Sequence, residues 1–157
     1  MFYLSRVQNQ RIWDAFGRPM GRCHDLLISH IDEAFPKVVA ITVQNGDQML
    51  AYIATEHISS LFPSIILNVP SEKLRAYAPT GSELPLAERV MDRQIVDTEG
   101  RRVVRVNDVQ IARIGERYCV TGVDVGGLGL LRRLGLETGI SAVARAIGKA
   151  LPERVIP

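Results

Sequence analysis

The chain has 157 residues, of which 46% are hydrophobic and 23% charged, which is typical of a soluble globular protein and not of a disordered one. Its net charge of +2 does not require a nucleic-acid partner, and no apolar run approaches the roughly 20 residues of a membrane helix. Arg6 and Arg11 interrupt the start, where a signal peptide would be apolar. Two scattered thiols, Cys23 and Cys119, favour a reducing compartment. We therefore expect a cytoplasmic protein.

The first half of the chain predicts five or six short strands. Asp14 to Gly17 reads as a tight turn, because Asp can accept a hydrogen bond from the backbone two residues on and Gly can take a positive φ. Asn45-Gly46 lies between two apolar runs and predicts a hairpin with a type I′ turn. One helical turn is expected at His57 to Phe62. The main strands are predicted at Tyr3 to Val7, Pro19 to Ile31, Val38 to Val43, Met49 to Ile53 and Ser64 to Val69.

The second half predicts a long strand, a turn and another strand, followed by a helix. The strands are Val103 to Ile114 and Tyr118 to Val125, joined by Gly115-Glu116. Apolar residues at helical spacing then predict an amphipathic helix near 139–151, for which Thr138 is a suitable N-cap. This helix is expected either to close a barrel end or to present a docking face.

An internal repeat relates the two halves at a constant spacing of 83 residues, as from 14 to 97 and from 28 to 111. Unrelated segments of this length would share only about one or two identities. The repeat predicts two units, 1–78 and 86–157, joined by a linker at 79–85, with the second unit cut short. The identical pairs are Arg6/Arg89, Val7/Val90, Ile12/Ile95, Asp14/Asp97, Gly17/Gly100, Arg18/Arg101, Arg22/Arg105, Asp25/Asp108 and Ile28/Ile111.

The repeated pattern of Val, Asp, Gly, an Arg-x-x-Asp step and an apolar strand resembles the PRC-barrel family of small β-barrel modules. The runs RQIVDTEGRRVVRVND, GVDVGGLGLLRRLG and LPERVIP resemble the N-terminal region of bacterial magnesium-transporter-like proteins that continue into MgtE-type and CBS domains. The resemblance implies a mainly β fold of two PRC-barrel-like barrels in tandem, with the C-terminal amphipathic helix inserted in the second. It also implies an adaptor without chemistry of its own.

The repeated aspartates Asp14, Asp25, Asp97 and Asp108 could form hard-cation sites, since carboxylates suit Mg²⁺. A structural role is favoured, because Asp14 and Asp97 begin tight turns. Asp25 and Asp108 are expected to pair with Arg22 and Arg105 or to accept hydrogen bonds from amides at strand ends. We therefore predict no metal site.

Other candidate chemistry has a simpler explanation. His24, His30 and His57 are scattered, whereas zinc sites draw on closely spaced ligands. Gly126 to Gly129 follows a strand, but Arg132 replaces the third glycine of a dinucleotide loop, so a flexible loop is expected. No nucleophile lies in a recognisable arrangement with a base. We predict that the protein is not an enzyme and needs no cofactor.

The second half uses Arg almost to the exclusion of Lys, and arginine makes two-point contacts with carboxylates and phosphates. Solvated surface ion pairs would explain this equally well, but partner binding is expected here if anywhere. The candidate partner-binding residues are Arg102, Arg113, Arg132, Arg133 and Arg145.

The sequence thus predicts a protein-interaction and regulatory module, the N-terminal part of a magnesium-transporter-like CBS-domain protein. Its expected partners are other domains of a longer chain or another protein, with a homodimer as a further option and Mg²⁺ involved only indirectly. Through a partner, the module could lie at the inner face of a membrane. The alternative function is an RNA- or ribosome-associated adaptor, although the charge makes nucleic acid an unfavoured partner. Its binding would fall steeply with salt.

Overall fold

A computed structural model describes residues 1–29, 35–97 and 102–125. The helix predicted near 139–151 and the inserted glycine-rich segment lie outside these residues. The described elements are β1 (Phe2–Tyr3), η1 (Leu4–Arg6), β2 (Arg11–Trp13), β3 (Pro19–Ser29), β4 (Lys37–Asn45), β5 (Gln48–Ala54), η2 (Thr55–His57), β6 (Ile58–Ser60), β7 (Ile65–Leu67), η3 (Ser71–Lys73), β8 (Leu84–Pro85), α1 (Leu86–Arg89), β9 (Gln94–Asp97), β10 (Arg102–Arg105), β11 (Asp108–Ile114) and β12 (Arg117–Asp124), where η marks a 3-10 turn.

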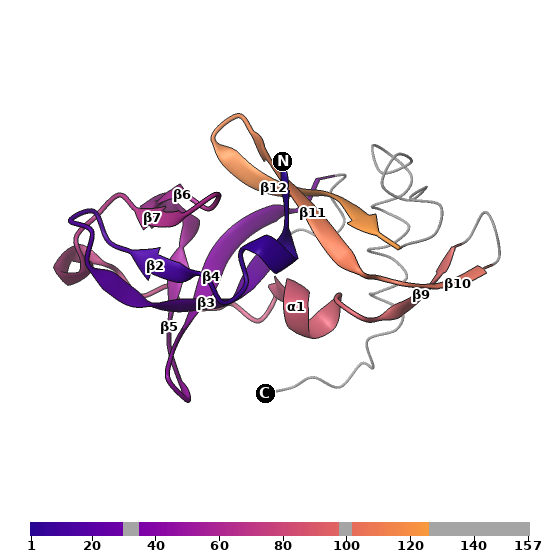
Figure 1. The fold of residues 1–157 in the computed structure, drawn as a ribbon, viewed down its shortest axis with the longest axis horizontal. Helices are drawn as coiled ribbons and strands as arrows, with labels where there is room; N and C mark the ends of the chain where they lie inside the picture. The colour runs from indigo at the N-terminus through magenta and orange to yellow at the C-terminus, as the bar shows by residue number, and fades with distance from the viewer. Residues whose placement is uncertain (30–34, 98–101, 126–157) are drawn as a thin grey trace.

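The predicted mainly β architecture is confirmed for the described residues. Ten of their strands form one sheet, in the order β1-β11-β12-β4-β3-β2-β7-β6, with β5 added to β4 and β8 added to β3. The long strands bend, so that the sheet curls like half of a barrel, and β9 and β10 form a separate ribbon at its side (Figure 1). Strands from both copies of the repeat therefore belong to the same sheet. In the described part of the chain, none of the helices has the length and apolar character needed to cross a bilayer.

Both predicted hairpins form, but one turn differs from the prediction. Asn45 pairs with Gln48, so the loop consists of Gly46 and Asp47, and Gly46 alone has the positive φ, at 61°. A glycine first in a two-residue loop is typical of a type II′ turn, which replaces the predicted type I′ turn. The second hairpin turns as expected at Gly115, whose φ is 63°.

Three other predicted elements are corrected. The strand expected at Tyr3 to Val7 is instead the 3-10 turn η1 over Leu4–Arg6, and only Tyr3 lies in a strand, β1. The helical turn expected at His57 to Phe62 lies earlier, at η2, and β6 follows it directly. The single strand expected from Val103 to Ile114 is two strands, because β10 ends at Arg105 and β11 begins at Asp108. Between them the amide of Val106 donates to the carbonyl of Arg93 instead of continuing the ladder.

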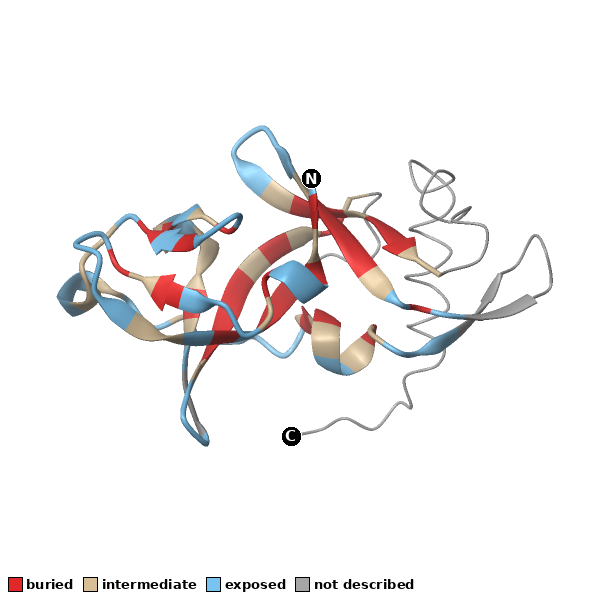
Figure 2. Ribbon diagram, viewed as in Figure 1, coloured by how far each residue is buried: buried red, intermediate tan, exposed pale blue. Residues whose placement is uncertain are grey.

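One apolar core is shared by the two copies of the repeat. Figure 2 shows buried residues concentrated on β3, β4, β11 and β12. The alternation of the strands places one face of the curled sheet inward, where β-branched and leucine side chains pack without contact with water. The largest fully buried side chains are Leu4, Val7, Ile12, Leu26, Ile41, Leu61, Ile65, Leu67, Leu86, Val106, Val109 and Ile111.

The two copies share a backbone turn at matching positions. The amide of Asn9 donates to the carbonyl of Cys23 at 2.7 Å, and 83 residues later the amide of Asp92 donates to that of Val106 at 2.9 Å. Asn9 and Asp92 also share a positive φ, 63° and 61°, a conformation that Asn and Asp tolerate better than most residues. The sequence repeat is therefore also a structural repeat.

The copies exchange short strands with each other. β1, from the first copy, pairs with β11 of the second, where Phe2 lies opposite Ile111. In return β8, from the segment predicted as the linker, pairs with β3 of the first copy, where Leu84 lies opposite Ile28. Ile28 and Ile111 are equivalent positions of the repeat, so the exchange is reciprocal.

The repeated aspartates complete this exchange. Asp25 is 2% exposed, and its carboxylate accepts hydrogen bonds from the amides of Leu26 and Ala87, both at 2.7 Å, and of Glu88 at 3.1 Å. Asp108 accepts from its own neighbour Val109 at 2.9 Å and from the amide of Ser5 at 3.1 Å. Each copy thus supplies the acceptor for amides at the start of a helical turn in the other, amides that have no partner within that turn.

We expect Asp25→Ala to lower the free energy of unfolding by about 3 kcal/mol, because one buried and two part-buried amides lose their acceptor. Asp108→Ala should cost about 1 kcal/mol, since Ser5 is exposed and water can replace the carboxylate there. Urea unfolding measures both values, with Asp47→Ala on the exposed hairpin loop as the control. A loss for Asp25→Ala no larger than for the control would show that the exchanged carboxylate does not hold the copies together.

Candidate interaction surface

Asp14 builds a turn, as predicted. Its Oδ1 accepts from the amides of Phe16 at 2.9 Å and Arg18 at 2.8 Å, and its Oδ2 accepts from Arg18 Nε at 2.8 Å and from the amide of Ser71 at 3.1 Å. Arg18 also donates a hydrogen bond from its Nη2 to Oε2 of Glu72, at 2.8 Å. Burial acts to raise the pKa of Asp14, but these donors outweigh it and lower the pKa from 3.8 to about 2.

Asp25 and Asp108 are not brought together around a cation. Both accept from backbone amides, but the donors from the other copy lie at the start of the helical turns α1 and η1 and not at the predicted strand ends. The guanidinium of Arg22 donates instead to the carbonyl of Asn9, at 2.8 Å. Asp97 lies in β9, and its side chain is outside the described residues. Over residues 1–29, 35–97 and 102–125, no three His, Cys, Asp or Glu side chains are grouped to hold a metal ion.

The described histidines and cysteines differ in their surroundings. His24 is exposed on β3, and His57 is half-buried with its Nε2 3.6 Å from a carboxylate oxygen of Glu56. Cys23 and Cys119 are buried, and burial raises the pKa of the Cys23 thiol to about 12. His30 and Gly126 to Gly129 lie outside the described residues.

Arg113 is the predicted partner-binding residue whose surroundings are best defined. It lies exposed near the tip of the β11–β12 hairpin, and its guanidinium carbon is 5.7 Å from the ring centre of Tyr118, its cross-strand partner. The backbone of Arg102 lies in β10, with its side chain outside the described residues. Arg132, Arg133 and Arg145 all lie beyond residue 125, where nothing is described.

Tyr118 connects Arg113 to two phenylalanines from distant parts of the chain. Its ring meets Phe2 edge-on at 5.9 Å, and Phe2 stacks on Phe62 at 5.2 Å with the planes 10° apart. The Tyr118 hydroxyl also accepts a hydrogen bond from the amide of Leu61 at 3.2 Å. We call these four side chains, Phe2, Phe62, Arg113 and Tyr118, the aromatic–arginine surface.

The aromatic–arginine surface is partly open to solvent. Phe62 is 42% exposed although its ring stacks on the buried Phe2, and Ile114 at the hairpin tip is 45% exposed. The outer end of the hairpin stands clear of the sheet in Figure 2. Aromatic and arginine side chains are enriched at protein interfaces, where they carry much of the binding energy. This surface is therefore chemically suited to contact another protein.

Sequence reasoning identified Arg113 but not the three aromatic residues around it. The pairing of Arg113 with Tyr118 could have been found, since the two residues flank the predicted loop Gly115-Glu116 at equal distances. Phe2 and Phe62 carry no such signal, because they reach the hairpin through tertiary packing.

Asp14 should make the stability of the fold depend on pH. Its folded-state pKa of about 2 lies below the ordinary 3.8, so the ionised carboxylate stabilises the fold above about pH 4, and this contribution is lost as the pH falls towards 2. We expect Asp14→Asn to lower the melting temperature at pH 6, with the difference from the wild type shrinking by pH 2. Thermal unfolding followed by circular dichroism measures this, with Asp47→Asn as the control. A difference that stays constant over this range would contradict the assigned role of the Asp14 carboxylate.

Comparison with known proteins adds no relative to this picture. Neither the known protein families nor the curated proteins give a match to the chain. What the protein does must therefore be inferred from its own residues and their arrangement.

Proposed function

We propose that the chain is a non-catalytic interaction and regulatory module made of two PRC-barrel-like units in tandem. In this proposal it is the N-terminal part of a magnesium-transporter-like protein with CBS domains, and it acts in the cytoplasm or, through a partner, at the inner face of a membrane. Magnesium would be involved only indirectly. The observation that carries the proposal is the aromatic–arginine surface.

The contrast between residues that occur in both copies and residues that occur in only one supports this proposal. Asp14, Asp25 and Asp108 are identical in the repeat, and their carboxylates are engaged in turns and in the exchange between copies. Arg113 and Tyr118 are not repeated. His30 stands 83 residues before Arg113, and because Val38 pairs with Ile28 as Val120 pairs with Ile111, Pro36 stands at the position of Tyr118. Residues that build the fold occur twice, whereas residues of the aromatic–arginine surface are particular to one place.

The aromatic–arginine surface is held in one arrangement before any partner arrives. The Phe62 ring is fixed by stacking on Phe2, and Arg113 is held over Tyr118, which is itself hydrogen-bonded to Leu61. Side chains that are already ordered lose less entropy on binding, so more of the contact energy appears as affinity. A complementary partner would offer an apolar side chain to Phe62 and a carboxylate to Arg113.

A photo-crosslinking amino acid at position 114 tests the proposal in cells that carry the natural full-length protein. We expect it to link the hairpin tip to a CBS-containing segment of the same protein or to another protein. The matched control is position 16, because Phe16 is 74% exposed on a turn of the first copy.

Identical product patterns from positions 114 and 16 would contradict a docking role for the aromatic–arginine surface. Products that disappear after ribonuclease treatment would replace the proposal with the RNA- or ribosome-associated adaptor. In that case binding should weaken steeply as salt is raised, because phosphate contacts release counterions.

A further inference from the structure

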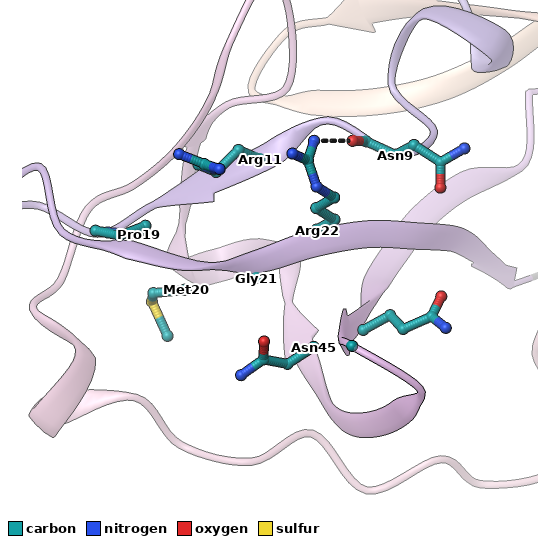
Figure 3. Close-up of a pocket in the computed structure, with 9 residues that line it drawn as sticks. Asn9, Arg11, Pro19, Met20, Gly21, Arg22 and Asn45 are labelled. Carbon is teal, nitrogen blue, oxygen red and sulfur yellow. Dashed lines mark hydrogen bonds between the residues drawn. The ribbon is translucent and has the colours of Figure 1, made fainter.

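A groove of about 660 Å³ lies in the first copy, bounded by β2, β3 and the loop between β4 and β5. Figure 3 shows Arg11 and Arg22 on the same side of β3, with Asn9 beside Arg22 and Asn45 across the strand. Gln44 also lines the groove, and none of the described side chains lining it is a carboxylate. Its volume is in the range of sites for small molecules.

The two arginines of the groove are direct cross-strand partners. Arg11 on β2 lies opposite Arg22 on β3. Like charges in this position repel each other and weaken a sheet. Among the described residues, no carboxylate forms an ion pair with either guanidinium. Arg22 donates to the carbonyl of Asn9, and the Arg11 guanidinium lies 5.6 Å from the ring centre of Trp13. Within residues 1–29, 35–97 and 102–125, the two positive charges of the groove therefore have no carboxylate partner.

The second copy shows what the fold itself needs at this position. There Gln94 lies opposite Arg105, at the positions that match Arg11 and Arg22. Asp92 replaces Asn9, so this copy also carries an acidic residue where the first has a neutral one. Since the same backbone forms with glutamine, the fold does not require the charge of Arg11.

The backbone of the groove is held closely in place at Gly21. This residue has a φ of 104°, and a Cβ added to it would lie 2.8 Å from the carbonyl oxygen of Gln44. Only glycine therefore fits where β3 passes β4. Next to Gly21, Arg22 on β3 pairs with Gln44 on β4, and both residues line the groove.

We propose that this groove binds the phosphate group of a small phosphate ester. Each guanidinium offers a planar pair of donors that matches two phosphate oxygens, and the phosphate supplies the charge that relieves the repulsion between Arg11 and Arg22. The groove is larger than a phosphate ion, so it leaves room for the organic part of the ester beside the amides of Gln44 and Asn45. This site is separate from the aromatic–arginine surface and does not depend on the proposed function.

Calorimetric titration of the full protein with inorganic phosphate, AMP and adenosine tests the site. We expect phosphate and AMP to bind, adenosine not to bind, and affinity to fall as salt is raised, since the charges are partly exposed. Tighter binding of AMP than of phosphate indicates an ester as the natural ligand, whereas equal binding indicates free phosphate. Either result supports the site. No binding of phosphate or AMP at millimolar concentration, or adenosine binding as tightly as AMP, would overturn it.

Arg11→Gln places a glutamine opposite Arg22, as Gln94 lies opposite Arg105 in the second copy. We expect this variant to bind AMP at least about tenfold more weakly while its melting temperature stays equal to that of the wild type or rises. Arg11→Lys, which keeps the charge but loses the planar fork, should give intermediate affinity. Arg75→Gln, on an exposed loop, should bind as the wild type does. Unchanged AMP affinity in both Arg11 variants would overturn the proposal.

Discussion

The structure depends on hydrogen bonds in which an Asp carboxylate of each copy accepts from backbone amides of the other. Asp25 is the buried member of this pair, and burial raises the pKa of its carboxyl, which means that charge at this place is costly. Amide donors from Leu26, Ala87 and Glu88 offset that cost, and two of them come from the second copy. Removing the second copy would take away two of the three amide donors of the buried Asp25 carboxylate, so the copies stabilise each other.

This exchange explains the shape of the molecule and where its surfaces lie. Because β1 crosses to the second copy and β8 to the first, both copies contribute strands to one curled sheet around one core. Three repeated aspartates, Asp14, Asp25 and Asp108, are engaged in a turn or in this exchange. The distinguishing chemistry lies at positions where the copies differ, Arg113 and Tyr118 on one side and Arg11 on the other. Duplication followed by divergence of the exposed positions would produce this distribution.

Local features of the fold could be predicted from the sequence, whereas contacts between distant segments could not. The turn at Asp14 and the hairpins at Gly46 and Gly115 follow from the preferences of Asp and Gly. The acceptor role of Asp25 was one of two alternatives, and its donors, 62 and 63 residues away, leave no local signal. The importance of Arg11 appears only when the pairing of β2 with β3 can be compared with that of β9 with β10, because the repeat by itself shows only a substitution of Arg by Gln.

If the two copies form one cooperative unit, urea unfolding followed by two signals should reveal a single transition. Trp13 is the only tryptophan and lies in the first copy, so its fluorescence reports on that copy, whereas far-ultraviolet circular dichroism reports on the strands of both. We expect the fluorescence and dichroism transitions to coincide, with the same midpoint and slope, as in all-or-none unfolding. A fluorescence transition that is complete while a large part of the dichroism signal remains would contradict it, because the second copy would then stand without the first.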